Sequence, residues 1–344
     1  MGGRLTMAKI KRLFNDPYDI VEEMVEGYVG AHKQYVKMCD LDEAQGRVVL
    51  ANDAGTKDKV GVIIGGGSGH EPLFIGYVGE DFADAVVIGN INTSPSPDPC
   101  YAAAKACDNG KGCIYLYGNY AGDVMNFDMG AEKADEEDDI RVETVLVTDD
   151  VVSSENIPDR RGIAGDFFVF KVAGAKAATG ADLDEVVAAA QKANDNTRSM
   201  GVAMSSATLP AKGGTIFDME DGDMEIGMGI HGEPGIRRGK IDTADNVIDE
   251  IMEPILKDLP YVEGDEVYVL VNSLGATPLI DLHVCYRRVA QILEEKRIKV
   301  YKALVGPFAC SMDMAGMSVT LMKLDDELKE LMDAPCDTPY FTQK

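Results

Sequence analysis

The amino-acid sequence predicts an α/β protein made of two α/β domains, with mostly parallel or mixed sheets linked by helices. Two observations lead to this prediction. Short apolar runs alternate with segments of helical periodicity between residues 59 and 148, which is typical of a mostly parallel sheet. The chain also has 344 residues, of which 45% are hydrophobic, so it is long and apolar enough for two ordinary domains.

Apolar and periodic patterns place the first group of elements before residue 150. One or two helices are expected within residues 14–36. Strands are expected at 59–64, 84–91, 112–118 and 141–148, with helices that open at Glu71, that run from near Pro99 to Cys107, and that cover 124–138. The acidic run at 132–139 is interpreted as the solvated face of this last helix and the loop after it.

The second half of the chain has a less regular pattern. Helices are expected at 165–179, 182–198, 243–259, 277–296 and 325–333, and strands at 201–206, 224–230, 266–272, 299–305 and 316–323. The helix at 182–198 has an apolar stripe and a polar end, so it could bridge two domains. We therefore expect an N-terminal α/β domain over residues 1–190 and a C-terminal α/β domain over residues 191–344.

Charge and composition narrow the class of protein. The net charge is −26, so nucleic acid and anionic lipid would repel the chain and are not expected as partners. No segment approaches about 18 uninterrupted apolar residues, so no membrane span is expected. The basic N-terminus lacks an apolar signal core and a cleavage pattern. These features predict a cytoplasmic protein.

The cysteines and histidines are few and informative. Seven cysteines form no CxxC pair, which indicates buried or free thiols in a reducing compartment and no zinc site or other metal centre. The only four histidines are His32, His70, His231 and His283. A histidine within a motif therefore carries unusual weight in this chain.

The first motif is GVIIGGGSGHEP, at residues 61–72. An apolar run breaks into a glycine turn that contains His70, and a helix is expected to open at Glu71, with Pro72 in its first turn. Such strand–turn–helix junctions hold anions and small ligands in α/β proteins. The motif has no lysine and fits neither a nucleotide P-loop nor the dinucleotide fingerprint.

The second motif is EIGMGIHGEPGIRRG, at residues 225–239, and it puts His231 in a glycine frame at the end of the strand expected at 224–230. Glycines let backbone and ligand approach closely, so His231 could act as a base, a ligand or a nucleophile. The alternative is a turn histidine that bonds a nearby carbonyl. A second Gly-His-Glu-Pro-like turn in a chain with four histidines favours function.

The third motif is YGNYAGDVMNFDMG, at residues 117–130. It follows a strand, so it should lie at the same carboxyl edge of the sheet as the glycine turn. Asp123 falls just before a helix, and the alternative to a functional role is an ordinary N-cap. Asp128 is expected on the helix face. A carboxylate can take a proton from a hydroxyl group, and a histidine can orient an oxygen or attack a carbonyl group.

In this order and spacing, GGGSGHEP, GNYAGDVMNFD and GIHGEPG resemble the dihydroxyacetone-binding domain of dihydroxyacetone kinases. The resemblance covers about residues 10–335. The chain ends without a second, all-helical ATP-binding domain, so it resembles the separate substrate-binding subunit of the bacterial multi-subunit kinases. The implied fold is two α/β domains in a homodimer.

The resemblance implies specific roles for the motif residues. His231 matches the histidine that forms a covalent hemiaminal with the carbonyl carbon of dihydroxyacetone. His70 and the backbone around Gly67 match groups that hydrogen-bond and polarise the substrate, and Asp123 matches the carboxylate that takes the proton of the attacking hydroxyl. The catalytic residues are thus His231, Asp123 and His70. The substrate-binding residues are Gly66, Gly67, Ser68, Gly69, His70, Asp123 and His231.

The resemblance also implies that the phosphoryl donor is held elsewhere. This chain would carry no cofactor, and a nucleotide-binding partner subunit would supply ATP, or an ADP recharged by a phosphohistidine phosphotransferase subunit, with Mg²⁺. One position departs from the pattern, because many such kinases have lysine where this chain has Gly118. A kinase subunit for another short ketose such as erythrulose, or a ketose-binding regulatory subunit, therefore stays open.

Overall fold

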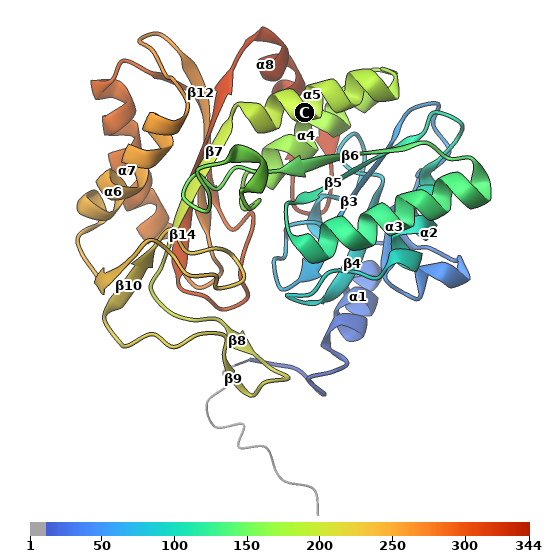
Figure 1. Cartoon of the computed structure of the whole chain (residues 1–344), viewed down its shortest axis with the longest axis horizontal. Coiled ribbons are helices and arrows are strands. Elements are labelled where there is room, and N and C mark those ends of the chain that lie inside the picture. The colour runs from blue at the N-terminus through green and yellow to red at the C-terminus, as the bar shows by residue number, and fades with distance from the viewer. Residues whose placement is uncertain (1–11) are drawn as a thin grey trace, which may run out of the picture.

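Two six-stranded sheets organise the computed structural model, which describes residues 12–344 (Figure 1). The first eleven residues, which form most of the basic N-terminal stretch, lie outside the described residues. The α/β prediction is confirmed, since both sheets carry helices and mix parallel with antiparallel pairs.

The first sheet has the strand order β1-β2-β4-β3-β5-β6. Its strands are β1 (Val36–Met38), β2 (Val48–Ala51), β3 (Gly61–Ser68), β4 (Ala85–Ile91), β5 (Cys113–Gly118) and β6 (Val142–Val147). The neighbouring strands β4, β3, β5 and β6 pair in parallel, as the alternating pattern predicts. The antiparallel strand β2 and the edge strand β1 beside it were not predicted, although residues 48–51 are an apolar run.

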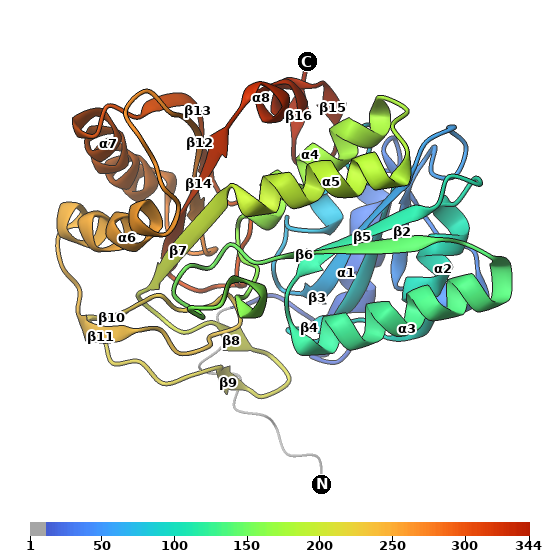
Figure 2. The same ribbon diagram turned by 45° about the horizontal axis from the view of Figure 1, so that its top comes forward.

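Helices cover both faces of this sheet (Figure 2). They are α1 (Ile20–Ala31), α2 (Pro97–Cys107), α3 (Ala121–Asp138), α4 (Asp166–Ala178) and α5 (Leu183–Asp195). Helices α2 and α3 pack together on one face, and α4 and α5 pack together on the other. The acidic end of α3 is exposed, as expected for a solvated face.

The second sheet has the order β11-β10-β7-β14-β12-β13 and is antiparallel except for its β12–β13 pair. Its strands are β7 (Thr197–Ala203), β10 (Asp223–Ile226), β11 (Arg237–Lys240), β12 (Glu266–Ser273), β13 (Lys299–Gly306) and β14 (Gly316–Leu324). Helices α6 (Ala244–Asp258) and α7 (Leu279–Glu295) pack beside it, and β8 (Thr208–Leu209) and β9 (Gly214–Thr215) form a small hairpin. Strand β11, which pairs with β10, was not predicted.

Helix α4 joins the two sheets. It contacts β3 and β5 of the first sheet, while the ring of Phe168 lies 5.3 Å from that of Tyr268 on β12. Phe167, Phe168 and Phe170 are fully buried, and even Lys171 is buried, where its Nζ donates to the Leu331 carbonyl. A helix with apolar residues on all sides is the expected solution for a position between two sheets.

The C-terminal segment returns to the first sheet. Helix α8 (Asp326–Asp333) and the strands β15 (Cys336–Asp337) and β16 (Thr342–Gln343) follow β14. Leu328, Leu331 and Cys336 belong to the hydrophobic core around β3, β4 and β5. The domain division after residue 190 stays a prediction, and the path of the chain shows that its last segment packs against the N-terminal half.

Two expected elements differ in the structure. No α-helix opens at Glu71. Residues 71–74 form turns that lead into a one-turn 3₁₀ helix, η3 (Ile75–Tyr77). Residues 73–77 are all buried, and Phe74 has φ 68°, so the segment cannot continue as an amphipathic helix. The strand expected at 224–230 ends at Ile226, because Gly227 turns the chain with φ 77°.

Two further expectations concern the state of the cysteines and the presence of a membrane span. All seven cysteines are free, and all but Cys285 are buried. Among the described residues, no helix is long and apolar enough to cross a membrane.

The packing of α4 predicts a stability effect at Gly174. A Cβ atom at this position would lie 2.0 Å from the Phe82 carbonyl oxygen, which is a backbone atom that cannot rotate away. We expect Gly174→Ala to lower the free energy of unfolding by about 1–3 kcal/mol. The control is Gly27→Ala in α1, where nothing lies within 4 Å and a gain of about 0.5–1 kcal/mol is expected. Equal melting temperatures for the two variants would contradict this packing.

Candidate active site

The three motifs meet in a small cavity between the two sheets. His70 follows β3, Asp123 lies in the first turn of α3, and His231 lies in the loop between β10 and β11. The cavity is narrow, with an accessible volume of about 10 Å³, and these three side chains line it together with Gly66 and Gly67. That is far below the roughly 300–1,000 Å³ of sites for drug-sized ligands. The site therefore suits a molecule of a few heavy atoms.

The glycine turn brings backbone to the cavity wall. Strand β3 continues through the glycines to Ser68 instead of ending before them. A Cβ atom on Gly67 would lie 2.7 Å from the Thr93 backbone nitrogen, and one on Gly66 would lie 2.7 Å from the Phe74 ring. Only glycine permits this approach of β3 to the loop after β4, so the glycines are required for packing as well as forming part of the cavity wall.

His70 is held by the loop between β13 and β14 of the second sheet. Its Nδ1 lies 2.8 Å from the Cys310 carbonyl oxygen, while the Cys310 N–H donates to the His70 carbonyl and the Met312 N–H donates to the Gly69 carbonyl. Because a carbonyl oxygen only accepts, Nδ1 carries the proton. Burial and the neighbouring His231 lower the pKa of His70 to about 3. Its buried Nε2 has no partner among residues 12–344, so it offers an acceptor to a ligand.

The His231 ring packs against the His70 ring, and Glu233 orients it. The two imidazole ring centroids are 4.6 Å apart at 82°, and the Tyr120 ring meets His231 edge-on at 4.5 Å. Glu233 accepts from the His231 Nδ1 at 3.1 Å and from its backbone N–H at 3.1 Å. A carboxylate on Nδ1 fixes the tautomer with a lone pair on Nε2. This is the arrangement of a nucleophilic imidazole.

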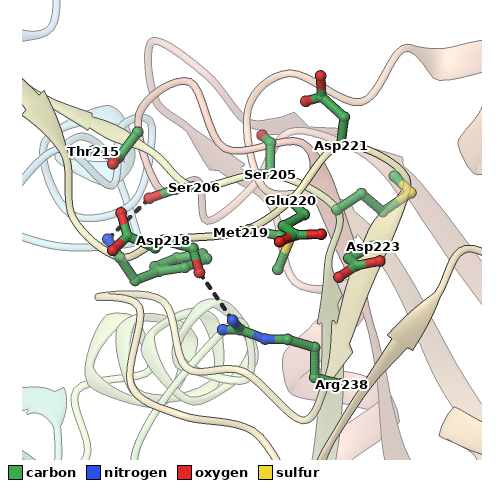
Figure 3. A pocket seen from close by; sticks show the side chains of 11 residues that line it. Ser205, Ser206, Thr215, Asp218, Met219, Glu220, Asp221, Asp223 and Arg238 are labelled. Carbon is green, nitrogen blue, oxygen red and sulfur yellow. Dashed lines mark hydrogen bonds between the residues drawn. The ribbon is translucent and has the colours of Figure 1, made fainter.

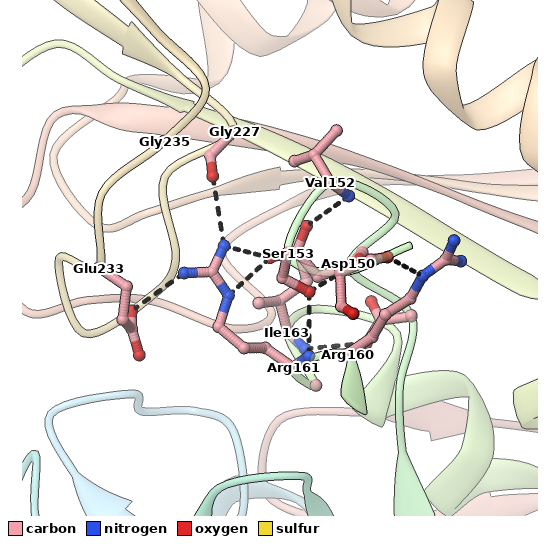
Figure 4. Close-up of polar contacts among 12 residues, drawn as sticks. Asp150, Val152, Ser153, Arg160, Arg161, Ile163, Gly227, Glu233 and Gly235 are labelled. Atoms are coloured by element: carbon pink, nitrogen blue, oxygen red, sulfur yellow. Dashed lines mark hydrogen bonds and ion pairs between the residues drawn. The ribbon is translucent and has the colours of Figure 1, made fainter. Parts of the chain in front are cut away.

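A cluster of charged residues supports Glu233 (Figure 4). Arg161 donates to Asp150 at 2.7 and 3.0 Å and to the Gly227 carbonyl at 3.3 Å, and its Nη1 lies 4.0 Å from a Glu233 oxygen. Burial alone would raise the pKa of Glu233, but the hydrogen bond from His231 and its charge outweigh burial and lower the pKa to about 2. Glu233 is therefore ionised and can balance a positive charge on His231.

Asp123 is inside α3, not at its N-cap, which is Tyr120. Its side chain is 8% exposed, and its Oδ1 is buried without a partner among the described residues. Burial raises the pKa of Asp123 to about 6, a rise that Ser94 and His231 only partly offset. A carboxyl group with a pKa near neutrality and a free oxygen in the cavity can serve as a general base.

Other predicted residues lie beside the cavity. The Ser68 hydroxyl donates to the Gly89 carbonyl at 2.8 Å, and the Gly69 N–H donates to Glu71, so neither residue lines the cavity wall. Asp128 is on the exposed face of α3, as expected.

Three polar residues of the site were missed by sequence reasoning: Tyr120, Asp166 and Glu233. A pattern in the sequence could have identified Glu233. In both Gly-His-Glu-Pro-like turns the glutamate accepts from the backbone N–H two residues earlier, which is Gly69 for Glu71 and His231 for Glu233. No pattern in the sequence identifies Asp166, because its burial depends on the tertiary packing of α4.

A larger hollow of about 710 Å³ lies elsewhere, beside the β8–β9 hairpin (Figure 3). Four carboxylates line it, and Arg238 donates to the Asp218 carbonyl at 2.9 Å at its edge. It is lined by no histidine and by none of the catalytic or substrate-binding residues expected from the sequence. The chemistry therefore points to the small cavity and not to the larger hollow.

Comparison with known proteins gives a family match over most of the chain. The Dak1 domain matches residues 26–340. The chain is 60% identical over 332 residues, 96% of this chain and 99% of the relative, to the "PTS-dependent dihydroxyacetone kinase 2, dihydroxyacetone-binding subunit DhaK" of Listeria innocua. It is 42% identical over 336 residues to the "L-erythrulose 1-kinase" of Mycolicibacterium smegmatis, covering 96% of this chain but 57% of that protein.

A solved structure shares the fold. The crystal structure of the dihydroxyacetone kinase of C. freundii superposes with a TM-score of 0.85 at 31% identity. The match covers 97% of this chain and 60% of that one. The chain therefore corresponds to part of that kinase.

The environment of His70 predicts its titration. In the unfolded chain a histidine titrates near pH ~6.5, whereas the pKa of folded His70 is about 3. The unfolded state thus binds the extra proton first, so stability should fall as the pH drops from ~6.5 toward 3. Nitrogen-15 NMR, assigned with His70→Asn, should show neutral His70 with its proton on Nδ1 at pH 5. A His70 signal that titrates near pH 6.5 would rule this out.

Proposed function

The chain belongs to the Dak1 domain family, and on this premise we propose that it is the dihydroxyacetone-binding subunit of a dihydroxyacetone kinase. It holds dihydroxyacetone as a hemiaminal on His231 while a partner subunit transfers a phosphoryl group to it, giving dihydroxyacetone phosphate. The observation that carries the proposal is the His231–Glu233 pair, which directs an imidazole lone pair to a cavity of small-molecule size.

The covalent step needs only groups of this chain and the substrate. The lone pair on Nε2 of His231 bonds to the carbonyl carbon, and the π bond of the carbonyl breaks toward its oxygen, which takes up a proton from solvent and becomes a hydroxyl. Ionised Glu233 stays on Nδ1 and balances the charge that develops on the imidazole. Glycerol has no carbonyl carbon, so this step selects the ketone.

Asp123 and His70 act on the hydroxyl groups of the captured molecule. Neutral His70 accepts a hydrogen bond at Nε2, which orients the substrate. Asp123, when ionised, takes the proton from the terminal hydroxyl as that oxygen attacks the phosphorus. The donor nucleotide with Mg²⁺ would sit on the partner subunit, as ATP or as an ADP recharged by a phosphohistidine phosphotransferase subunit. This chain would hold neither cofactor nor metal.

Two finer statements belong to the proposal. Free buried thiols suit a reducing compartment, so we place the protein in the cytoplasm. We also propose a homodimer, because β13 is an edge strand and α7 beside it exposes Leu279, Ile280 and Val284. Light scattering should then give twice the 37.0 kDa of one chain.

A kinase subunit for a four-carbon ketose is the second candidate, favoured by the identity to an L-erythrulose 1-kinase and by Gly118, which leaves the cavity wall without a side chain at that position. A regulatory subunit that only binds a ketose is less well supported. Binding alone needs no proton acceptor, whereas Asp123 is placed in the cavity as one.

Covalent capture predicts a selective loss of binding. Calorimetric titration of the wild type should detect dihydroxyacetone but not glycerol, and His231→Ala should give no measurable heat with dihydroxyacetone, because the bond to Nε2 cannot form. The control is His283→Ala, since His283 is exposed on α7 outside the cavity. Titration of erythrulose in parallel identifies the preferred ketose. If His231→Ala binds dihydroxyacetone as the wild type does, the covalent role of His231 is wrong.

The role of Asp123 predicts both a variant and a pH profile. Asp123→Asn should lower turnover of the reconstituted kinase by about 10²–10⁴-fold, while ketose binding stays within a few-fold. Since the pKa of Asp123 is about 6 and only the ionised form accepts a proton, turnover should fall as the pH drops through 6. A pH profile that is flat between 5 and 7 would contradict this role.

A further inference from the structure

Asp166 is an acidic residue in the wall of the cavity to which the mechanism above gives no role. It occupies the first turn of α4, between the two sheets, and only 1% of it is exposed. Its carboxyl group lines the same cavity as His70, Asp123 and His231. Its Oδ1 is buried and has no hydrogen-bond partner among residues 12–344. Buried polar atoms are almost always paired, so this oxygen is a candidate ligand contact.

The neighbouring residue Asp149 is a buried carboxylate whose hydrogen bonds are structural, and it serves as a comparison for Asp166. Asp149 is also fully buried, but it accepts from the backbone N–H groups of Ile163 and Gly165, both at 2.8 Å. These bonds fix the loop that leads into α4. Asp166 has no comparable bond at Oδ1, so it is not needed for holding this loop in the same way.

The surroundings of Asp166 favour its protonated form. Burial is the main cause that raises its pKa well above the usual range, and the carboxyl groups of Asp149 and Asp123 add to it. The N-terminus of α4 favours negative charge, but three carboxyl groups share this small region. A protonated carboxyl group is a hydrogen-bond donor.

The space next to Asp166 is open because two glycines meet there. A Cβ atom on Gly162 would lie 2.5 Å from the Gly118 Cα and 3.1 Å from Oδ1 of Asp166. Gly162 and Gly118 must therefore both lack a side chain for the Asp166 carboxyl group to face the cavity. Gly118 lines the cavity as well, so the Asp166 oxygen lies beside the part of the wall that lacks a side chain.

The other polar side chains of the wall do not donate to a ligand. His70 and His231 each offer a lone pair at Nε2, ionised Asp123 accepts, and the Tyr120 hydroxyl already donates to the Gly162 carbonyl at 3.0 Å. A ketose has a carbonyl oxygen that can only accept. We propose that Asp166 is a substrate-binding residue, and that its carboxyl group donates a hydrogen bond to an oxygen atom of the bound ketose. This inference rests on the proposed function.

The test compares two substitutions of similar size. Asp166→Asn keeps a donor at the same place, whereas Asp166→Leu removes both polar atoms. Calorimetric titration with dihydroxyacetone and with erythrulose should show binding within about threefold of the wild type for Asp166→Asn and weaker by about tenfold or more for Asp166→Leu. The melting temperature of Asp166→Leu should not fall, because an unpaired buried polar group is replaced by an apolar one.

The matched control is Tyr261→Phe. The Tyr261 hydroxyl is also buried without a partner among the described residues, but it does not line the cavity, so its removal should leave ketose binding unchanged. If Asp166→Leu binds ketoses as tightly as the wild type, the role of Asp166 is overturned while the proposed function stands. If the wild type itself binds neither ketose, both fall.

A second measurement covers the case in which Asp166→Leu does not fold. Infrared difference spectra on addition of dihydroxyacetone should show a shift of the C=O stretching band of a protonated carboxyl group in the wild type. The shift should be absent in Asp166→Asn and present in Tyr261→Phe. A wild type that binds dihydroxyacetone without this shift overturns the inference.

Discussion

The site depends on one contact between the two sheets, the backbone pairing of residues 69–70 with residues 310–312. The N–H groups of Cys310 and Met312, in the loop between β13 and β14, donate to the carbonyls of His70 and Gly69, and the Cys310 carbonyl accepts from the His70 ring. This contact joins the turn after β3 to the loop after β13. It also fixes the tautomer of His70, so the same contact that closes the cavity decides what His70 can offer a ligand.

The electrostatics of the cavity select a neutral molecule. The nearest cation in the supporting cluster, Arg161, is bonded to Asp150 and stands behind Glu233, and the described wall has no lysine or arginine. The wall presents two imidazole lone pairs and two carboxyl groups whose pKa values are raised. A phosphate group would meet no counter-charge here, whereas a hydroxyketone can satisfy each of these polar atoms. The proposed binding of the phosphoryl donor by a partner subunit agrees with this absence of counter-charge.

Much of the fold and of the site could be predicted from the sequence. The parallel strands from β4 to β6 follow from their apolar runs, and His70, Asp123 and His231 follow from their glycine-rich frames. The helix expected at Glu71 was wrong because the residues after Pro72 are buried on every side, a property that periodicity cannot reveal in a short segment. Asp166 was missed for a related reason, since a carboxyl group at the start of a helix is normally exposed and only the neighbouring sheet buries this one.

The most direct test of the account is to observe the bond between His231 and the substrate. Dihydroxyacetone labelled with carbon-13 at its carbonyl carbon would be bound to protein labelled with nitrogen-15 in its histidines, and the spectrum recorded by NMR. The account predicts a tetrahedral carbon with a one-bond carbon–nitrogen coupling that disappears in His231→Ala. A bound molecule whose labelled carbon shows no coupling to nitrogen would contradict covalent capture, since the hydrate of dihydroxyacetone also has a tetrahedral carbon but no such bond.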